Sequence, residues 1–533
     1  MSEAAATLPA VAKPAPTYAS PAINPWVIAL AVTLATFMEV LDTSIANVSL
    51  PHIAGGLGAS VDESTWILTS YLVSNAIVLP MSGWFSQLIG RKRFYMTCVA
   101  IFTISSFLCG LAPNLPTLIF LRVMQGAGGG GLQPSEQAIL ADTFAPAKRG
   151  MAFAVYGMAV VVAPAIGPTL GGFITDNYSW RWIFYINVPI GIISLLLTSR
   201  LITDPPYLRG RRQQGIKIDY IGISLLALGL GALQIVLDKG QRDDWFASHF
   251  ITALVAISVV ALVACIIWEW RHPSPIIDLK LFRDRSFAIG NAMMFMLGFV
   301  LLGTTLLLPL FAQTLMGYPA EKAGLALMPG GLLILCCMPL VGFLLSKYDP
   351  RRLMIFGLTI LACALYFMTH FFNLDVDFRI VAAARMIQGA GLAFLFVPIN
   401  TVAYSYLPPG KNNAASGLIN LARNIGGSVG ISYVTTMLDR RTQFHQDRLS
   451  AHLNPASPGV QAMLHGATGA LTSHSGFAAR QQAYALLQFN IMRQATMLSY
   501  IDNFHLLAIA AIVLIPFVFL IKKPKHLGAV QAH

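Results

Sequence analysis

Charged residues are scarce in this chain. Only 11% of its 533 residues are Asp, Glu, Lys or Arg, whereas 56% are hydrophobic. A soluble domain has roughly 25% charged residues. The scarcity of charge therefore excludes a soluble domain and indicates a protein whose surface lies largely in lipid.

Cysteine is also scarce. The six cysteines fall in apolar stretches without the spacing of metal ligands, so we interpret them as core filling: Cys98, Cys109, Cys265, Cys336, Cys337 and Cys363. The sequence has no P-loop lysine motif, metal-ligand cluster or nucleophile elbow, and it supports neither ATP use nor covalent catalysis. We therefore expect no enzyme, no metal site and no cofactor. Gly126-x-Gly128-x-x-Gly131 lacks the preceding strand of a dinucleotide site and predicts close helix packing instead.

Long apolar runs, by contrast, are abundant. They recur from Trp26 to Leu520, and each is long enough to cross the ~30 Å hydrocarbon core as a helix. The short alternating segments of a transmembrane barrel are absent. We predict an all-α polytopic membrane protein with about fourteen helices, at residues 26–50, 65–85, 94–111, 117–140, 151–173, 182–199, 220–237, 250–270, 287–311, 324–345, 353–372, 380–406, 414–437 and 504–521.

The net charge of +12 records membrane orientation and does not indicate nucleic-acid binding. Most Lys and Arg residues fall at the two termini and in the loops after even-numbered predicted helices. Cytoplasmic loops carry such an excess of positive charge, so this bias places both termini in the cytoplasm.

One heptapeptide occurs twice. Arg122-Val-Met-Gln-Gly-Ala-Gly128 returns 263 residues later as Arg385-Met-Ile-Gln-Gly-Ala-Gly391. An arginine at bilayer depth costs at least ~2.5 kcal/mol, so each copy should face a protein interior or a water-filled path. Same-sense repeats predict two six-helix bundles related by a pseudo-twofold axis along the membrane normal, with substrate between them. The helices at 220–237 and 250–270 have no repeat partner, and we interpret them as an insertion.

These patterns divide the chain into six regions: a disordered cytoplasmic tail at 1–24, an N-terminal bundle at 25–201, a basic linker and two inserted helices at 202–285, helices of the C-terminal bundle at 286–438, a periplasmic segment at 439–502, and a last helix with a cytoplasmic tail at 503–533. Within the polar segment 439–502, residues 478–499 have a helix-forming composition. The segment is either a mobile loop or a docking surface for a periplasmic partner.

Several motifs carry a family resemblance. They are Leu41-Asp-Thr-Ser-Ile-Ala-Asn47 in the first helix, Gly83…Gly90-Arg91-Lys92 after the second, Arg122…Gln125-Gly126 in the fourth, Gly157…Pro164…Gly167-Pro168…Gly171-Gly172 in the fifth, and Trp180-Arg-Trp-Ile-Phe184 with Asn187-Val-Pro-Ile-Gly191 around the sixth. Over about residues 25–525, the chain resembles the major facilitator superfamily, and within it the fourteen-helix drug:proton antiporters of the Emr type.

This resemblance implies a secondary active transporter, driven by the proton gradient, that exports amphipathic drugs or toxic organic compounds across a bacterial inner membrane. It also implies two partners, a periplasmic membrane-fusion adaptor and an outer-membrane channel. Two alternatives stay open, because fold alone does not fix function. One is transport of a specific metabolite, fatty acid or siderophore, and the other is a membrane-embedded sensor.

The loop after the second helix departs from the family pattern. The family usually has an acidic residue where Gln87 stands. The charge relay that the resemblance assigns to the cytoplasmic gate loop, formed by Gly83, Gly90, Arg91 and Lys92, is therefore open to question. In the alternative interpretation, Arg91 and Lys92 anchor to lipid headgroups or helix ends.

Acidic residues inside the predicted helices are the strongest candidates for proton coupling, because such residues are costly and usually functional. Glu39 and Asp42 are three residues apart and share a helix face. We predict that Asp42 carries the proton, with Glu39 second and Arg122 tuning proton affinity. The alternatives are a lasting Asp42–Arg122 pair or a helix brace, and a Glu39 that faces a polar crevice.

Glu136 lies fourteen residues after Arg122, or ~21 Å along one helix, which excludes a direct pair between them. Proton coupling and a solvated position at the helix end are both open for Glu136. In the fifth helix, glycines allow close approach, whereas Pro164 and Pro168 remove amide donors and bend the chain. This pattern predicts a kinked helix that seals the path between the bundles, with generic small-residue packing as the alternative.

The substrate pocket should be largely apolar with a few polar groups. We predict that it includes Gln125, Phe295, Phe299, Gln313, Arg385, Gln388, Asn400 and Arg423. The predicted helices at 287–311, 380–406 and 414–437 contain no acidic residue. We therefore hypothesise that Arg122 serves proton coupling, whereas Arg385 and Arg423 either brace helix ends or favour anionic substrates.

Overall fold

The structure is a computed structural model that describes residues 24–522, apart from 146–147, 206–217, 274, 406, 409, 452, 454–456 and 476–478. Within the described residues every regular element is a helix, as predicted. Three predicted features lie outside this part: nearly all of the tail at 1–24, the cations of the basic linker at 206–217, and the tail after residue 522.

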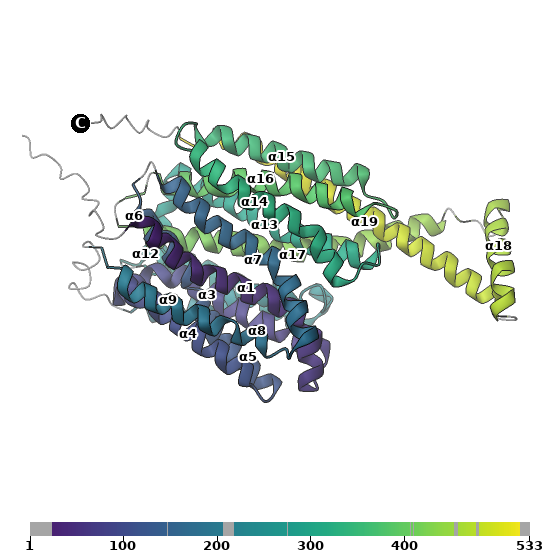
Figure 1. The fold of residues 1–533 in the computed structure, drawn as a ribbon, viewed down its shortest axis with the longest axis horizontal. Coiled ribbons are helices and arrows are strands. Elements are labelled where there is room, and N and C mark those ends of the chain that lie inside the picture. The colour runs from purple at the N-terminus through teal and green to yellow at the C-terminus, as the bar shows by residue number, and fades with distance from the viewer. Residues whose placement is uncertain are drawn as a thin grey trace, which may run out of the picture.

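The N-terminal half is a helical bundle. Figure 1 shows its purple-to-blue helices packed together on one side of the molecule. Its elements are α1 (Pro25–Leu57), α2 (Val61–Ser64), α3 (Trp66–Ile89), α4 (Arg91–Leu111), α5 (Leu115–Gly129), α6 (Leu132–Thr143), α7 (Arg149–Asn177), α8 (Trp182–Tyr185) and α9 (Asn187–Leu201).

The inserted helices and the C-terminal half follow. They are α11 (Tyr220–Lys239), α12 (His249–Arg271), α13 (Arg285–Thr314), α14 (Ala320–Leu344), α15 (Pro350–Phe371), α16 (Phe378–Tyr404), α17 (Asn412–Ala451), α18 (Pro458–Ser475) and α19 (Ala479–Phe519). The inserted α11 packs on α3 of the first half and on α17 of the second, and α12 packs on α11. The insertion therefore borders both halves.

Eleven helices of the described chain are long and apolar enough to cross a membrane, or twelve if the bent α7 counts as one span. Two of the fourteen predicted spans fall short of this measure. The span at 117–140 is divided between α5 and α6, and the span at 414–437 is polar, with Asn420, Arg423 and Asn424 in α17. These two less apolar segments contribute many of the buried polar groups described below.

The division between α5 and α6 corrects the prediction of one continuous helix. Glycines occupy positions 128–131, and each costs a helix about 1 kcal/mol relative to alanine. They also pack closely, since a Cβ on Gly130 would lie 2.6 Å from the carbonyl oxygen of Asn75. The glycine run therefore ends α5 at Gly129, and α6 starts again at Leu132.

Helix α7 bends by 42° between Pro164 and Ile166, so the predicted kink is confirmed. On one side, a Cβ on Gly167 would lie 2.3 Å from the Ser44 hydroxyl of α1. On the other, a Cβ on Gly157 would lie 2.9 Å from the Met338 sulfur of α14. Glycines therefore let α7 pack tightly between the two halves.

Helix α18 and the nearby part of α19 project from the bundle, with the last part of α17, at the end opposite both termini of the described chain (Figure 1). Helix α17 continues to Ala451, and α19 begins at Ala479 and runs without interruption to Phe519. The helical prediction for 478–499 is confirmed from residue 479 onward. At the base of this projection Asp502 Oδ2 accepts bonds from Arg441 Nε at 2.6 Å and pairs with His445 Nε2 at 2.8 Å.

The cysteines follow the prediction only in part. Cys98, Cys109 and Cys265 are buried, whereas Cys336 and Cys363 are exposed. Core filling is therefore wrong for these two, which lie on outward faces of α14 and α15. A thiol is apolar enough to face lipid there.

Candidate functional site

The centre of the N-terminal half is an ion pair. Arg122 Nη1 on α5 donates to Asp42 Oδ2 on α1 at 2.6 Å, and to Gln125 Oε1 at 2.8 Å. The other oxygen, Asp42 Oδ1, accepts from Gln125 Nε2 at 3.0 Å and from Asn187 Nδ2 at 2.7 Å. Three helices, α1, α5 and α9, thus converge on one carboxylate.

This pair is enclosed. Arg122 has no exposed surface and Asp42 has 2%. The guanidinium carbon lies 4.3 Å from the centre of the Tyr71 ring and 5.7 Å from that of Phe184. The structure therefore contains the paired arrangement, and a proton that binds Asp42 removes the negative charge of a charge-assisted hydrogen bond.

Glu39 lies one turn away on α1 but does not contact Arg122. Its Oε2 accepts from Gln133 Nε2 at 2.6 Å, and its Oε1 accepts from Asn75 Nδ2 at 3.2 Å and from the Tyr71 hydroxyl at 3.4 Å. Glu39 is 4% exposed and, within the described chain, forms no ion pair. Its carboxyl group is therefore held by neutral donors alone.

Glu136 on α6 is more isolated still. Its Oε1 accepts from the Thr33 hydroxyl at 2.6 Å, and its Oε2 has no partner within the described chain. The side chain has no exposed surface, so the alternative of a solvated helix end is wrong. Division of the fourth predicted helix explains this, because α6 turns its residues 132–141 into the bundle.

A second-half cation completes this network. Arg423 on α17 donates to the Tyr156 hydroxyl at 3.1 Å and to Gln133 Oε1, and the amide of Gln133 in turn holds Glu39. Arg423 therefore neither braces a helix end nor stands free in a pocket. It connects the two halves through one glutamine to a buried carboxyl group.

The cytoplasmic gate predicted from the loop motif also joins the halves. Arg91 Nη2 pairs with Asp142 Oδ2 at 2.7 Å, and Arg91 Nη1 donates to Asn413 of α17 at 3.2 Å. Asp142 Oδ1 accepts from Asn412 Nδ2 at 2.6 Å. Arg91 is only 3% exposed, so the alternative of lipid-headgroup anchoring is wrong for this residue.

The glycines and the lysine of that loop have separate roles. A Cβ on Gly83 would lie 2.8 Å from Cα of Ala414, which brings α3 against α17. Gly90 has a φ of +93°, a conformation that glycine adopts most easily. Lys92 Nζ donates to the carbonyl oxygen of Ser199 at 2.6 Å in the last turn of α9, so helix-end anchoring is confirmed for Lys92.

The second arginine of the repeat lies in a similar circuit. Arg385 Nη1 donates to Gln388 Oε1 at 2.7 Å, and Arg385 Nη2 donates to the Thr305 hydroxyl at 3.3 Å. Gln388 Nε2 donates to the Thr304 hydroxyl at 2.7 Å. Within the described chain, no carboxylate pairs with Arg385.

The other predicted pocket residues do not meet in one cavity. Asn400 is buried and donates to the carbonyl oxygen of Phe396 at 2.9 Å. Phe295 and Phe299 are half-buried on α13, where Phe299 packs against Tyr433, and Gln313 is exposed. The structure thus separates the predicted set into the Arg122 cluster, the Arg385 cluster, the Arg423 bridge and single residues.

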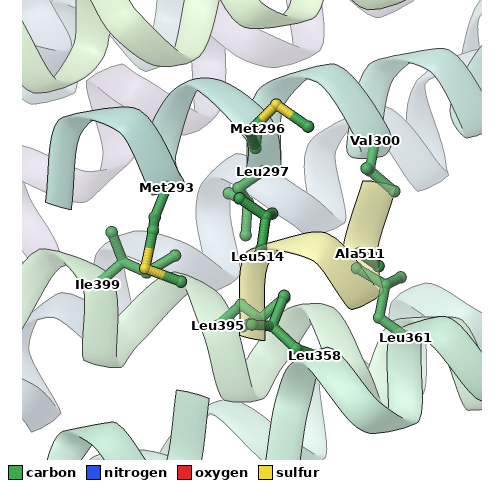
Figure 2. Close-up of a pocket in the computed structure, with 10 residues that line it drawn as sticks. All are labelled: Met293, Met296, Leu297, Val300, Leu358, Leu361, Leu395, Ile399, Ala511 and Leu514. Carbon is green, nitrogen blue, oxygen red and sulfur yellow. The ribbon is translucent and has the colours of Figure 1, made fainter. Parts of the chain in front are cut away.

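Two cavities lie elsewhere. Figure 2 shows an apolar one of about 10 Å³ among α13, α15, α16 and α19, lined by residues that include Met293, Leu297 and Leu395. A larger one of about 390 Å³ lies at the base of the projecting helices, beside Asp439 and Tyr500. Neither contains a residue predicted for the substrate pocket.

Several network residues were not among the sequence candidates, and they include Gln133, Asp142, Tyr156 and Asn187. Asn187 stands in a quoted motif, and Gln133 lies three residues before Glu136 on one face of α6, so both had a sequence signal. Asp142 and Tyr156 carry no signal in a single sequence, because their partners belong to distant segments.

Comparison with known proteins gives a consistent result. The sequence model of the Major Facilitator Superfamily matches residues 32–431. Multidrug export protein EmrB of Escherichia coli K12 is 39% identical over 94% of this chain and 96% of its own length. Fatty acid resistance protein FarB of Neisseria gonorrhoeae is 41% identical over 94% of this chain and 97% of its own.

Solved structures share the fold at much lower identity. The proton:xylose symporter XylE, bound to 6-bromo-6-deoxy-D-glucose, superposes with a TM-score of 0.58 at 15% identity, covering 89% of this chain and 94% of its own. The human organic anion transporter MFSD10 gives a TM-score of 0.56 at 12% identity, covering 92% and 100%. Such low identities support a common fold alone.

Proposed function

The chain belongs to the major facilitator superfamily, and from this premise we propose that it exports amphipathic drugs or toxic organic compounds in exchange for protons. Its EmrB relatives are named as multidrug export proteins. The observation that carries the proton coupling is the enclosed set of three acids, Glu39, Asp42 and Glu136, in the N-terminal half. No bound cofactor enters this proposal, because the proton gradient supplies the energy.

The three acids differ in their partners, and we assign their roles accordingly. Asp42 is the primary carrier, since its protonation removes the charge that holds Arg122. Glu39 is the second, because protonation weakens the charge-assisted bond from Gln133. Glu136 is a third site, at the oxygen that lacks a partner.

Coupling to movement follows from the same contacts. Gln133 holds Glu39 of the first half and Arg423 of the second. When Glu39 gains a proton, the amide is held less strongly and the bridge between the halves weakens. The Arg91–Asp142 pair with Asn412 and Asn413 connects the two halves at the end of the bundle nearest the termini, and these bonds would have to break for that side to open.

The motif of α7 serves as a seal in this cycle. Gly157, Gly167 and Gly171 pack against neighbouring helices, and Pro164 lies at the bend. Gly172 has no atom within 4 Å of an added Cβ, so tight packing does not account for it. Movement of α14 against the bent α7 would open and close the path between the halves.

The relative FarB supports a second candidate substrate within the same transport function. Its name assigns it to fatty acid resistance, and a fatty acid is itself an amphipathic compound. Substrate would bind between the halves once they separate, because Gln388 and Asn400 are enclosed in this conformation, and it would leave by the cavity of about 390 Å³ at the base of the projection. A cavity of that size suits a drug-sized molecule.

We further propose that the chain lies in the inner membrane with both termini in the cytoplasm. The projection of α17 and α19 then extends into the periplasm. Its exposed apolar side chains, Tyr484, Phe489 and Met492, offer a surface to a periplasmic adaptor that leads to an outer-membrane channel. Site-specific crosslinking from position 489 tests this, and absence of any adaptor crosslink would contradict it.

Transport in proteoliposomes tests the main proposal. Flux of a chemically varied panel is measured with and without a pH gradient across the vesicle wall. We expect accumulation of several unrelated amphiphiles that collapses with a protonophore. Flux restricted to one metabolite would support a specific transporter instead, and ligand binding without any flux would support a sensor.

A further inference from the structure

The two copies of the repeated arginine have matching hydrogen-bond circuits. In each, the arginine Nη1 donates to the glutamine three residues later, at 2.8 Å for Arg122 and 2.7 Å for Arg385. In each, that glutamine donates to a group on the first helix of its half. Thr305 lies 263 positions after Asp42, the same separation as between the two arginines, and it accepts from Arg385.

The circuits differ in charge. Asp42 neutralises Arg122, whereas Arg385 bonds only to neutral oxygens. The hydroxyl protons of Thr304 and Thr305 are already donated to the carbonyl oxygens of Val300 and Leu301, at 2.8 and 2.7 Å. Both threonines therefore serve Gln388 and Arg385 as acceptors.

Arg385 is thus a buried cation without a counter-charge in the described chain. It is 7% exposed, and its Nε has no hydrogen-bond partner among the residues that the structure describes. A charge at membrane depth is costly unless it is paired. A singly charged anion would supply what Asp42 supplies in the first half.

We propose that Arg385 and Gln388, whose guanidinium and amide donate here to Thr305 and Thr304, form a binding site for the carboxylate of an amphipathic ligand, which would replace the threonine hydroxyls as acceptor. This inference rests on the proposed export of amphiphiles and names one class among them. An amphipathic ligand suits the position, because α16 packs here on α13 and α14 and all three helices are apolar enough to cross a membrane, so they would hold the hydrocarbon part.

The site is closed in this conformation. Gly330 of α14 packs on the arginine, since a Cβ there would lie 2.6 Å from Arg385 Cγ. Gly389 packs on the same turn of α14, where its Cβ would lie 2.6 Å from the carbonyl oxygen of Gly330. Binding therefore requires α14 and α16 to separate, and the ligand would favour that open state.

The test is ligand-induced thermal stabilisation of the purified full chain in detergent. Decanoate below its micellar concentration is compared with decanol and with sodium chloride. We expect stabilisation by decanoate alone. Thr305→Asp places an internal carboxylate where the first half has Asp42, and it should weaken decanoate binding by at least about 10-fold.

Thr305→Asn is the matched control, since it is similar in size to the aspartate but uncharged. It should bind decanoate more tightly than Thr305→Asp does. If Thr305→Asp fails to fold, Arg385→Gln replaces it and should also weaken binding by about 10-fold. Unchanged decanoate affinity in the variants, or equal stabilisation by decanol or by chloride, would overturn the proposal.

This experiment is independent of proton coupling, because binding to the purified chain needs no gradient. Failure of decanoate binding would remove the carboxylate site and leave gradient-driven flux of other amphiphiles to be judged in proteoliposomes. Absence of such flux with decanoate binding intact would instead remove the antiport proposal.

Discussion

The sites around Arg122 and Arg385 share a heptapeptide, a helix position and an arginine–glutamine contact. Arg122 faces Asp42, and Arg385 faces Thr305. One position in the partner helix therefore changes a neutral buried pair into a buried unpaired cation. A repeat in sequence preserves the scaffold, whereas the charge opposite it determines what each half can bind.

The halves also depend on each other. The N-terminal half holds Glu39, Asp42 and Glu136, and the C-terminal half supplies Arg423 to the glutamine that holds Glu39. The two bundles therefore do not function separately. Of the three arginines inside the predicted helices, Arg122, Arg385 and Arg423, the last one contacts residues of the other half.

The largest expected difference is in the free energy of unfolding, between the variant that lacks Arg122 and the variant that lacks Arg385. Arg122→Gln leaves Asp42 buried without its partner, which we expect to cost about 3–5 kcal/mol of unfolding free energy. Arg385→Gln removes a cation that has no carboxylate, and we expect a change within about 1 kcal/mol. Unfolding of the purified variants in mixed micelles measures both.

The double variant Asp42→Asn/Arg122→Gln is the control for this contrast. It removes both charges and should regain most of the lost stability. Similar losses for Arg122→Gln and Arg385→Gln would mean that the two sites do not differ in charge balance.

The next largest expected effect is on transport, and it concerns Arg423, which connects the two halves through Gln133. Arg423→Gln should lower gradient-driven flux by about 10-fold, because it removes a charged donor to Gln133. Arg440→Gln, at an exposed position on the same helix, should leave flux unchanged. If Gln133→Ala and Arg423→Gln reduced flux additively, the two residues would not act through one shared hydrogen-bond bridge.

The closed end of the bundle offers a smaller effect. Arg91→Gln and Asp142→Asn should show a coupling of about 0.5–3 kcal/mol in a double-mutant cycle on unfolding, since the two side chains form one pair. Lys92→Gln is the matched control because Lys92 contacts only one half. Additive effects of the two variants on the free energy of unfolding would show that the pair does not stabilise the closed end.

The smallest effect belongs to an ion pair at the surface of the C-terminal half. Partial burial tends to raise the pKa of Asp284, but the bond from Lys522 at 2.7 Å and the Phe287 amide hold this pKa below its ordinary value. The pair therefore stabilises the fold above that ordinary pKa of about 4, and this is lost as the pH falls below it.

We expect less than about 1 kcal/mol from this pair, because Lys522 is half exposed. Lys522→Gln should reduce the acid sensitivity of unfolding between pH 5 and 3, by roughly that amount. An unchanged pH dependence would show that the C-terminal half has no ionic stabilisation here.

Much of this comparison could be predicted from the sequence. Repetition of the arginine motif, scarcity of acids and the helix-5 prolines predicted two halves, a carboxyl site in the first and a bend in α7. Periodicity and hydropathy are determined by residues that are close together in the sequence. Such features can therefore be recognised in a single sequence.

The rest depends on contacts between distant segments. Breaking of the fourth helix moved Glu136 from an expected helix end to an enclosed site. Arg423 meets Gln133 across 290 positions, and Arg91 meets Asn413 across 322. No local pattern encodes such pairings, so Asp142 and the contact between Gln133 and Arg423 were not foreseen.

If proton coupling resides at the carboxylate facing Arg122, replacing Asp42 should abolish the response of transport to a pH gradient. Substrate flux in proteoliposomes, measured with and without the gradient for Asp42→Asn and Asp62→Asn, tests this. Asp62 is a matched control because its side chain is 92% exposed on α2. We predict that Asp42→Asn transports no faster with the gradient than without it, while Asp62→Asn responds fully. A full response in Asp42→Asn would show that the proton is carried elsewhere.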